Sequence, residues 1–220
     1  MTKKSINSAL FTSVMMVLIM TMVYVSTLQN KETESVIPSL LTDVVLNRPE
    51  IVSLNNLIDH KNLVLTNDRI NDYWTFVFFG YTHCPDVCPA TLSQMSQFNE
   101  RLKEDSDLSE KTQFFFVSVD PDRDTTHILS NFVSFFDSSF TALTGSADDI
   151  RLVEDQFGTF HQFEKETAPG EYAVTHSAFV YLINPSGQLA AKFSPPMNLD
   201  KVRSQLNLFV ELFSKNRKLS

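Results

Sequence analysis

Residues 74–95 read WTFVFFGYTHCPDVCPATLSQM, and this stretch predicts a strand, a loop and a helix in succession. The run from Trp74 to Phe79 is nearly continuous in aromatic and β-branched residues, which is typical of a strand buried on both faces. After a loop with two cysteines, Cys88, Leu92 and Met95 recur at helical spacing. We therefore expect both thiols where a central strand ends and a helix begins.

The rest of the chain alternates strand-like runs with helix-like segments, which indicates an α/β domain. Further strands are predicted at Gln113 to Val119 and at Phe179 to Ile183, and the turn sequence from Asn184 to Gly187 joins the second to a hairpin strand at Leu189 to Phe193. Helices are predicted after Thr125 with Ile128, Phe132 and Phe135 on it, from Asp148 to Phe157, and from Leu199 to Phe213.

The predicted position of Cys84 and Cys88 favours thiolates, because the free N–H groups and the dipole of a helix N-terminus stabilise negative charge. Three residues separate the cysteines, where the thioredoxin redox pattern has two. On a regular helix this spacing separates the Cβ atoms by ~5–6 Å, beyond the span of a relaxed disulfide. A metal that bridges two sulfurs tolerates the gap more easily, while a disulfide in a proline-bent loop remains an alternative.

The ligand types favour copper. Two soft thiolates suit Cu(I), and an added imidazole gives a site that can also hold Cu(II). A structural zinc site normally has four Cys or His ligands, and this chain has only two cysteines.

The third ligand must come from one of five histidines. His83 adjoins Cys84, but neighbouring side chains in an extended loop diverge. His176 immediately precedes the strand from Phe179 to Ile183, and in a thioredoxin-like sheet that loop faces the helix bearing the thiols. We therefore predict His176 as the third ligand. The remaining histidines are expected to be solvated: His60, His127 and His161.

The N-terminal segment predicts a membrane anchor. Between Lys4 and Lys31 lie 26 uncharged residues, and residues 9–28 match the ~20 residues that cross a bilayer. No convincing signal-peptide cleavage site follows, so we expect this helix to stay on the protein. The two lysines before it and the acidic residues after it place the N-terminus inside and the domain outside.

This reading divides the chain into a cytoplasmic leader (1–8), a transmembrane anchor (9–28), a tether (29–50), a domain (51–214) and a C-terminal tail (215–220). A leader this short is no mitochondrial presequence, which favours a single-pass protein of the bacterial inner membrane with its domain in the periplasm. Without Lys3 and Lys4, 16 of the 18 basic residues remain against 26 acidic ones, so the domain is a poor candidate for binding nucleic acid.

Three motifs occur in order over roughly residues 50–212: FFGYTHCPDVCPATL at 78–92, VSVDPDRDT at 117–125 and VTHSAFVYLINPSG at 174–187. With them the chain resembles the Sco/SenC family of thioredoxin-fold copper proteins. The resemblance implies that Cys84, Cys88 and His176 are the copper ligands. It also implies that Asp120 either supports these ligands without binding copper itself or acts as a weak ligand. Family members often carry Asp before the histidine, where this chain has Thr175, and this difference can alter the orientation of the ring.

The resemblance implies a partner and leaves two functions open. A metallochaperone would deliver copper to the dinuclear centre of cytochrome c oxidase subunit II, or to another periplasmic copper protein. A thiol-disulfide oxidoreductase would keep such cysteines reduced, with Cys84 as the attacking thiolate and Cys88 as the resolving thiol. A thiol peroxidase is a weaker third reading, because the Pro-x-x-x-Thr-x-x-Cys arrangement is missing before Cys84.

Overall fold

The structure is a computed structural model that describes residues 3–31, 38–46 and 50–217, with the side chains of 11–25, 38–46, 50–215 and 217. The chain divides into two compact units, Met1–Thr42 and Asp43–Ser220. Parts of the predicted leader, tether and tail, at 1–2, 32–37, 47–49 and 218–220, lie outside the described residues. The boundaries of those predicted segments stay predictions.

The first unit consists mainly of helix α1 (Lys3–Lys31), which contains the predicted anchor at 9–28. Large apolar side chains between Phe11 and Val25 are exposed on this helix. Among the helices that the structure describes, none combines the length and apolarity needed to cross a membrane.

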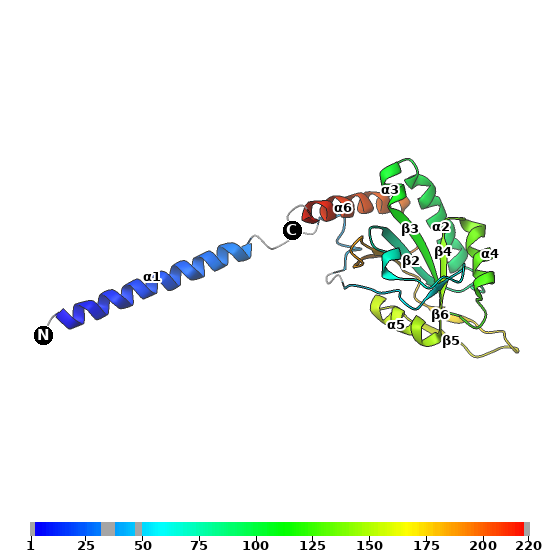
Figure 1. The fold of residues 1–220 in the computed structure, drawn as a ribbon, viewed down its shortest axis with the longest axis horizontal. Coiled ribbons are helices and arrows are strands. Elements are labelled where there is room, and N and C mark those ends of the chain that lie inside the picture. Colours follow the sequence, from blue (N-terminus) through cyan, green and yellow to red (C-terminus); the bar gives the residue numbers. More distant parts are fainter. Residues whose placement is uncertain (1–2, 32–37, 47–49, 218–220) are drawn as a thin grey trace. The chain divides into compact units, whose positions relative to one another are not determined.

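The second unit is an α/β domain whose sheet has the order β1-β4-β3-β2-β7-β8 (Figure 1). Strand β2 pairs in parallel with β3 and antiparallel with β7, so the sheet is mixed. The strands are β1 (Ile58–Asp59), β2 (Trp74–Gly80), β3 (Thr112–Ser118), β4 (Thr141–Thr144), β5 (His161–Phe163), β6 (Val174–His176), β7 (Val180–Ile183) and β8 (Leu189–Phe193). The helices are the 3-10 helix η1 (Asn67–Arg69), α2 (Val87–Leu102), α3 (Ser106–Glu110), α4 (Thr126–Phe136), α5 (Ala147–Phe157) and α6 (Leu199–Arg217).

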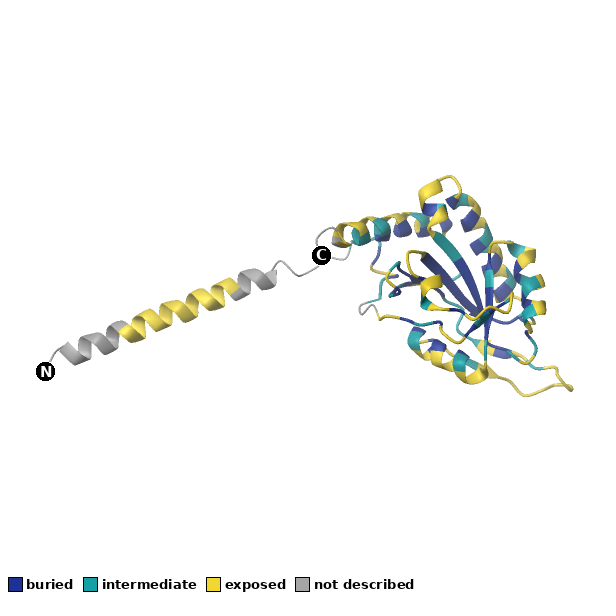
Figure 2. Cartoon of the chain, in the orientation of Figure 1, coloured by how far each residue is buried: buried dark blue, intermediate teal, exposed yellow. Residues whose placement is uncertain are grey.

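Every side chain of β2 is buried, as the apolar run predicts, and Figure 2 shows this buried sheet at the centre of the domain. Alternate residues of a strand face opposite sides. On one side Phe76 packs edge-on against Phe98 of α2, with ring centroids 5.3 Å apart. On the other side Phe79 packs against Phe157 of α5, with centroids 5.1 Å apart. The sheet is therefore mixed and covered by helices on both faces, which confirms the α/β prediction.

The predicted strands and helices form, and α4 carries Ile128, Phe132 and Phe135 as expected. Leu129 and Val133 are fully buried, whereas Phe135 is 85% exposed and Ile128 38% exposed. The ring of Phe132 packs against Phe116 of β3, with ring centroids 5.5 Å apart. The helix is apolar on several sides, so its periodicity alone does not indicate which side is buried.

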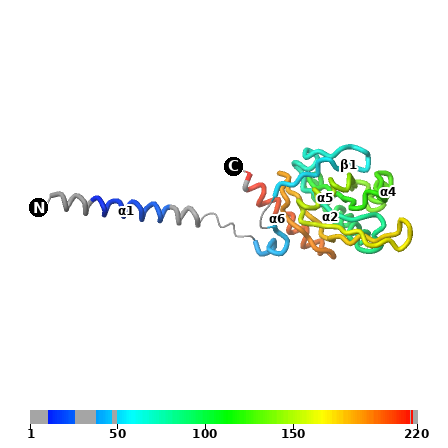
Figure 3. Tube along the Cα trace, turned by 90° about the horizontal axis from the view of Figure 1, so that it is seen from below, coloured from blue at the N-terminus to red at the C-terminus, as the bar shows by residue number. Residues whose placement is uncertain are grey.

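Strands β5 and β6 form a separate two-stranded sheet in which His161 lies opposite His176. The loop that joins them reaches away from the body of the domain in both views (Figures 1 and 3). Only three residues separate His176 from the start of β7 at Val180. Strand β7 runs antiparallel to β2, so the start of β7 lies beside the carboxyl end of β2. The hairpin therefore places His176 close to that end of β2.

Candidate metal centre

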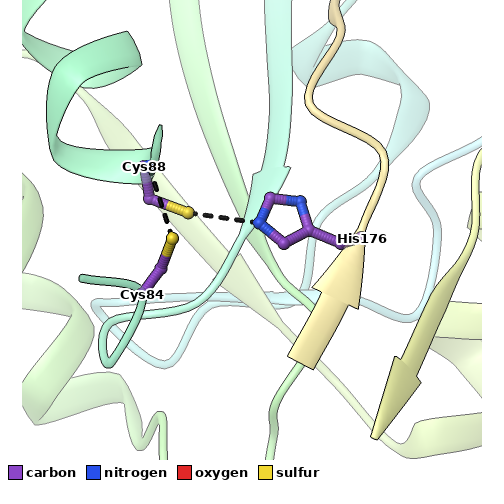
Figure 4. Close-up of side chains that lie close together, drawn as sticks. All are labelled: Cys84, Cys88 and His176. Carbon is purple, nitrogen blue, oxygen red and sulfur yellow. Dashed lines mark hydrogen bonds between the residues drawn. The ribbon is translucent and has the colours of Figure 1, made fainter. Parts of the chain in front are cut away.

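The two cysteines lie at the junction of β2 and α2, as the sequence predicts. Strand β2 ends at Gly80, and helix α2 begins at Val87. Cys88 is fully buried in the first turn of this helix, and Cys84 in the preceding loop is 8% exposed. The backbone N–H of Cys88 points at the Sγ atom of Cys84, 3.4 Å away (Figure 4).

His176 reaches the thiols from the end of β6. Its Nε2 atom lies 3.4 Å from the Sγ atom of Cys88 (Figure 4). Its Nδ1 atom lies 3.0 Å from the carbonyl oxygen of Ser177. Because a carbonyl only accepts, Nδ1 carries a proton in this arrangement, and Nε2 is the ring nitrogen that faces the sulfurs and could bind a metal.

Cys84, Cys88 and His176 form a group that could hold a metal ion, with their ligand atoms all within 4.8 Å of one another. Two ligands on one metal, with bonds of ~2.3 Å to sulfur and ~2.0 Å to nitrogen, lie at separations of this order. Both cysteines are free thiols, so neither is consumed in a disulfide. The geometry fits one ion held by two sulfurs and one imidazole.

The two thiols are electrostatically unequal. The hydrogen bond from Cys88 lowers the pKa of Cys84 to about 4, against the opposing effect of burial, and His176 contributes in the same direction. The hydrogen bond with Cys84 and then burial raise the pKa of Cys88. At neutral pH the pair therefore holds one negative charge on Cys84 before any metal binds.

Gly80 allows the close approach of Cys88. A Cβ atom at residue 80 would lie 2.7 Å from the Sγ atom of Cys88 and 2.9 Å from a ring carbon of Phe116. Contacts under 3.0 Å between such atoms require a shift of the surroundings. Because residue 80 has no Cβ atom, the buried thiol of Cys88 has room to lie close to the backbone of β2.

We expect Gly80→Ala to displace Cys88, and so to weaken copper binding and to lower the free energy of unfolding by about 1–3 kcal/mol, the usual effect of overpacking. Gly145→Ala is the matched control, since its Cβ would lie 2.9 Å from Leu57 Cδ2 at the outer edge of the sheet. The control should lose stability but keep its copper affinity, as measured by chelator competition and thermal unfolding. Equal copper affinity in both variants contradicts this role of Gly80.

Asp124 holds the loop that carries Cys84. This fully buried carboxylate accepts hydrogen bonds from the Thr82 N–H at 3.0 Å, the Thr82 hydroxyl at 2.5 Å and the Ser118 hydroxyl at 2.6 Å. Burial raises the pKa of Asp124, and the hydrogen bonds from Ser118 and Thr82 oppose that rise. The carboxylate thereby ties the thiol loop to the end of β3. Asp124 lies in the motif at 117–125, but no signal in the sequence distinguishes it as the residue that holds this loop.

Asp120 lies outside the ligand group that the described residues form. Its two carboxylate oxygens accept hydrogen bonds from Tyr172 at 2.8 Å and from Arg123 at 2.5 Å. Burial, together with the bond to Asp120, raises the pKa of Tyr172 to about 12. The carboxylate therefore faces Arg123 and Tyr172, and the weak-ligand role has no support in this arrangement. No sequence signal pointed to Tyr172.

The other histidines lie outside the ligand group. The side chain of His83 is 54% exposed, and its Nδ1 atom lies 3.1 Å from the Thr82 hydroxyl. His127 is exposed, as predicted. The prediction of a solvated His161 is wrong, because its Nδ1 atom pairs at 2.7 Å with Glu154 and both side chains are 5% exposed. His60 is half-buried and accepts the N–H of Ala142.

A sequence profile described as SCO1/SenC matches residues 46–211, which is most of the chain. The chain belongs to the SCO1/SenC family. Among curated proteins it is similar to Protein SCO2, mitochondrial, of Saccharomyces cerevisiae, with 30% identity over 168 residues that cover 74% of this chain and 55% of the relative. The chain thus spans little more than half the length of the first curated relatives that it matches.

Two solved structures of the family share the fold. The domain is similar to the apo Sco1 protein of Thermus thermophilus, with 31% identity and a TM-score of 0.66 over 75% of this chain and 94% of the other. It is also similar to ScoI of Arabidopsis thaliana with copper bound, with 27% identity and a TM-score of 0.66 over 75% of this chain and 98% of the other. The likeness to these structures confirms the predicted thioredoxin-like fold of the domain.

Proposed function

We propose that this SCO1/SenC protein is a copper carrier in which Cys84, Cys88 and His176 hold one copper ion. The observation that carries this proposal is the meeting of two free thiols and one imidazole, with ligand atoms within 4.8 Å of one another. Thiolate sulfur selects Cu(I), and the imidazole lets the same site accept Cu(II). The copper-bound state of the similar Arabidopsis thaliana protein supports the choice of metal.

The recipient that we propose is the dinuclear copper centre of cytochrome c oxidase subunit II. A centre with three protein ligands leaves copper coordinatively unsaturated, so a ligand of the recipient can bind before a ligand of the carrier leaves. Such exchange transfers the ion without any covalent or redox step. Family membership supports this partner.

A thiol-disulfide oxidoreductase acting on the same recipient is the second candidate. The lowered pKa of Cys84 and the adjacent thiol of Cys88 favour it, because a thiolate attacks a disulfide and a neighbouring thiol resolves the mixed disulfide. In that reaction the recipient gains two thiols while Cys84 and Cys88 become a disulfide. Regeneration then requires an external dithiol reductant.

Deletion of the gene separates the two candidates. We expect loss of respiratory growth and of copper from the oxidase, because unassisted copper insertion is slow at low copper concentration. Added copper salts should restore both if the protein delivers copper, whereas an added membrane-permeable thiol reductant should restore both if it reduces the recipient. Normal oxidase copper content in the deletion strain would contradict both candidates.

We also propose that the N-terminal segment attaches the protein to the bacterial inner membrane, with the domain in the periplasm. The uncharged run from 5 to 30 and the exposed apolar side chains between Phe11 and Val25 support attachment. Fractionation tests it: the full chain should sediment with membranes and resist an alkaline wash, and deletion of residues 1–31 should release it. A full chain that the wash extracts completely contradicts the proposal.

A further inference from the structure

The three candidate ligands come from two separate pieces of the domain. Cys84 and Cys88 belong to the junction between β2 and α2, whereas His176 ends β6 of the two-stranded sheet. The distance between the imidazole and the thiols therefore depends on how the β5–β6 hairpin is held against the domain. The connection to β7 restrains the hairpin on one side of His176, and contacts of Tyr172 and Val174 restrain it on the other.

Arg123, Asp120 and Tyr172 form such a contact, which we call the Arg123 clasp. Arg123 donates from Nε to Asp120 at 2.5 Å and from Nη1 to the carbonyl oxygen of Tyr172 at 2.9 Å. The Tyr172 hydroxyl donates to the second carboxylate oxygen of Asp120 at 2.8 Å. The guanidinium also lies 3.6 Å from the centre of the Tyr172 ring, a cation–π contact. The clasp joins the loop after β3 to the residue two positions before β6.

Tyr81 connects the clasp to the imidazole. The Arg123 guanidinium lies 5.7 Å from the centre of the Tyr81 ring. The Tyr81 hydroxyl accepts the N–H of Val174, the first residue of β6, at 3.3 Å. The Tyr81 ring meets the ring of His176 edge-on, with centroids 5.8 Å apart. A continuous set of contacts thus runs from the clasp through Tyr81, both to the first residue of β6 and to the third ligand.

The clasp is built from groups that are costly to leave unpaired. Asp120 is fully buried, and the Arg123 side chain is 15% exposed. Hydrogen bonds to buried charged groups are stronger than those between neutral groups, and a buried carboxylate that loses a donor stays poorly solvated. Removal of the Tyr172 hydroxyl would therefore favour rearrangement of the clasp, and with it a shift of the hairpin.

We propose that Arg123 is a positioning residue, and that its clasp with Asp120 and Tyr172 keeps His176 on the metal. When the clasp opens, the hairpin moves, the imidazole leaves and copper remains on two thiolates. The inference rests on the proposed function, and within it the clasp controls when the imidazole leaves the copper after a ligand of the recipient has bound. This step breaks the metal–nitrogen bond and the hydrogen bonds of the clasp, and no electron moves.

Tyr172→Phe tests the clasp, because it removes one hydrogen bond and keeps the ring under Arg123. We expect it to weaken Cu(I) binding about tenfold, the effect of one hydrogen bond to a charged group. Copper K-edge absorption should show less nitrogen coordination. Thr167→Val is the matched control, since it removes a bond from the Thr167 hydroxyl to Glu171 inside the same hairpin. It should leave affinity and coordination unchanged.

A double-mutant cycle decides whether the clasp acts through the imidazole. In a His176→Ala background, Tyr172→Phe should cause no further loss of copper affinity. An equal tenfold loss in both backgrounds would mean that the clasp acts on the thiols, which overturns the proposal. Arg123→Lys keeps the charge but loses the planar guanidinium. It should also weaken copper binding in the wild-type background and cause no further loss in the His176→Ala background.

Hydrogen exchange in the metal-free protein gives an independent readout. Because Val174 N–H is bonded to Tyr81, its exchange should accelerate in Tyr172→Phe and not in Thr167→Val. Unchanged exchange in Tyr172→Phe overturns the proposal. If the wild-type protein binds no copper, the proposed function fails, while this measurement still decides whether the clasp holds the hairpin.

Discussion

His176→Ala is expected to weaken copper binding by the purified, reduced protein by about a hundredfold or more. Changing a residue that merely orients a ligand costs about 10- to 100-fold in metal affinity, and removal of the ligand itself should cost at least as much. The variant keeps both thiols, so copper should still bind, with one ion per molecule and two sulfur ligands. Competition with a Cu(I) chelator of known affinity measures the loss.

His83→Ala is the matched control for this prediction. His83 adjoins Cys84 in sequence, but its side chain is 54% exposed and lies outside the ligand group. The control should therefore keep the affinity of the wild-type protein. Full affinity in His176→Ala, together with a loss in His83→Ala, would show that the adjacent histidine is the ligand and that our assignment is wrong.

The sequence predicted the elements that carry the site because their signals are local. An apolar run, two cysteines and a helical repeat of Cys88, Leu92 and Met95 follow one another without a gap, and β2 and α2 form as expected. The meeting of Cys88 with His176, 88 residues later, was predicted from fold topology and from the motif at 174–187, since nothing local relates the two residues.

The contacts that hold the ligands in place could not be predicted from the sequence, for a physical reason. Asp120 and Asp124 lie in one Asp-rich turn motif and look alike in sequence, yet Asp124 binds the thiol loop and Asp120 binds Arg123 and Tyr172. Which way each carboxylate points depends on the tertiary packing of three segments. His161 was misread similarly, because its partner Glu154 lies on α5, in a different element.

Spectroscopic titration of the metal-free, reduced protein should reveal a thiolate that persists far into the acid range. An ordinary cysteine has a pKa near 8.5, so at pH 6 less than about 1% of it is thiolate. With the pKa of Cys84 lowered to about 4, nearly one thiolate per molecule should remain at pH 6. Absorbance near 240 nm, followed from pH 8 downward, should fall with a midpoint near pH 4.

Variants of the two cysteines separate the causes of this shift. Cys84→Ser should abolish the thiolate signal, and Cys88→Ala should raise the midpoint, because the hydrogen bond from Cys88 is the largest cause of the lowered pKa of Cys84. Cys88→Ser is the matched control, since its hydroxyl can still donate, and it should stay closer to the wild-type protein. A wild-type midpoint above pH 7 would contradict the assignment.

The sign of the accompanying stability change follows from the same pKa. A thiol whose pKa is lower in the folded state than in the unfolded state stabilises the fold fully above the unfolded pKa near 8.5. That contribution declines as the pH falls and is lost at the folded pKa of about 4. The wild-type protein should therefore lose stability relative to Cys84→Ser between pH 8.5 and 4, and a constant difference across this range would mean that Cys84 does not ionise as proposed.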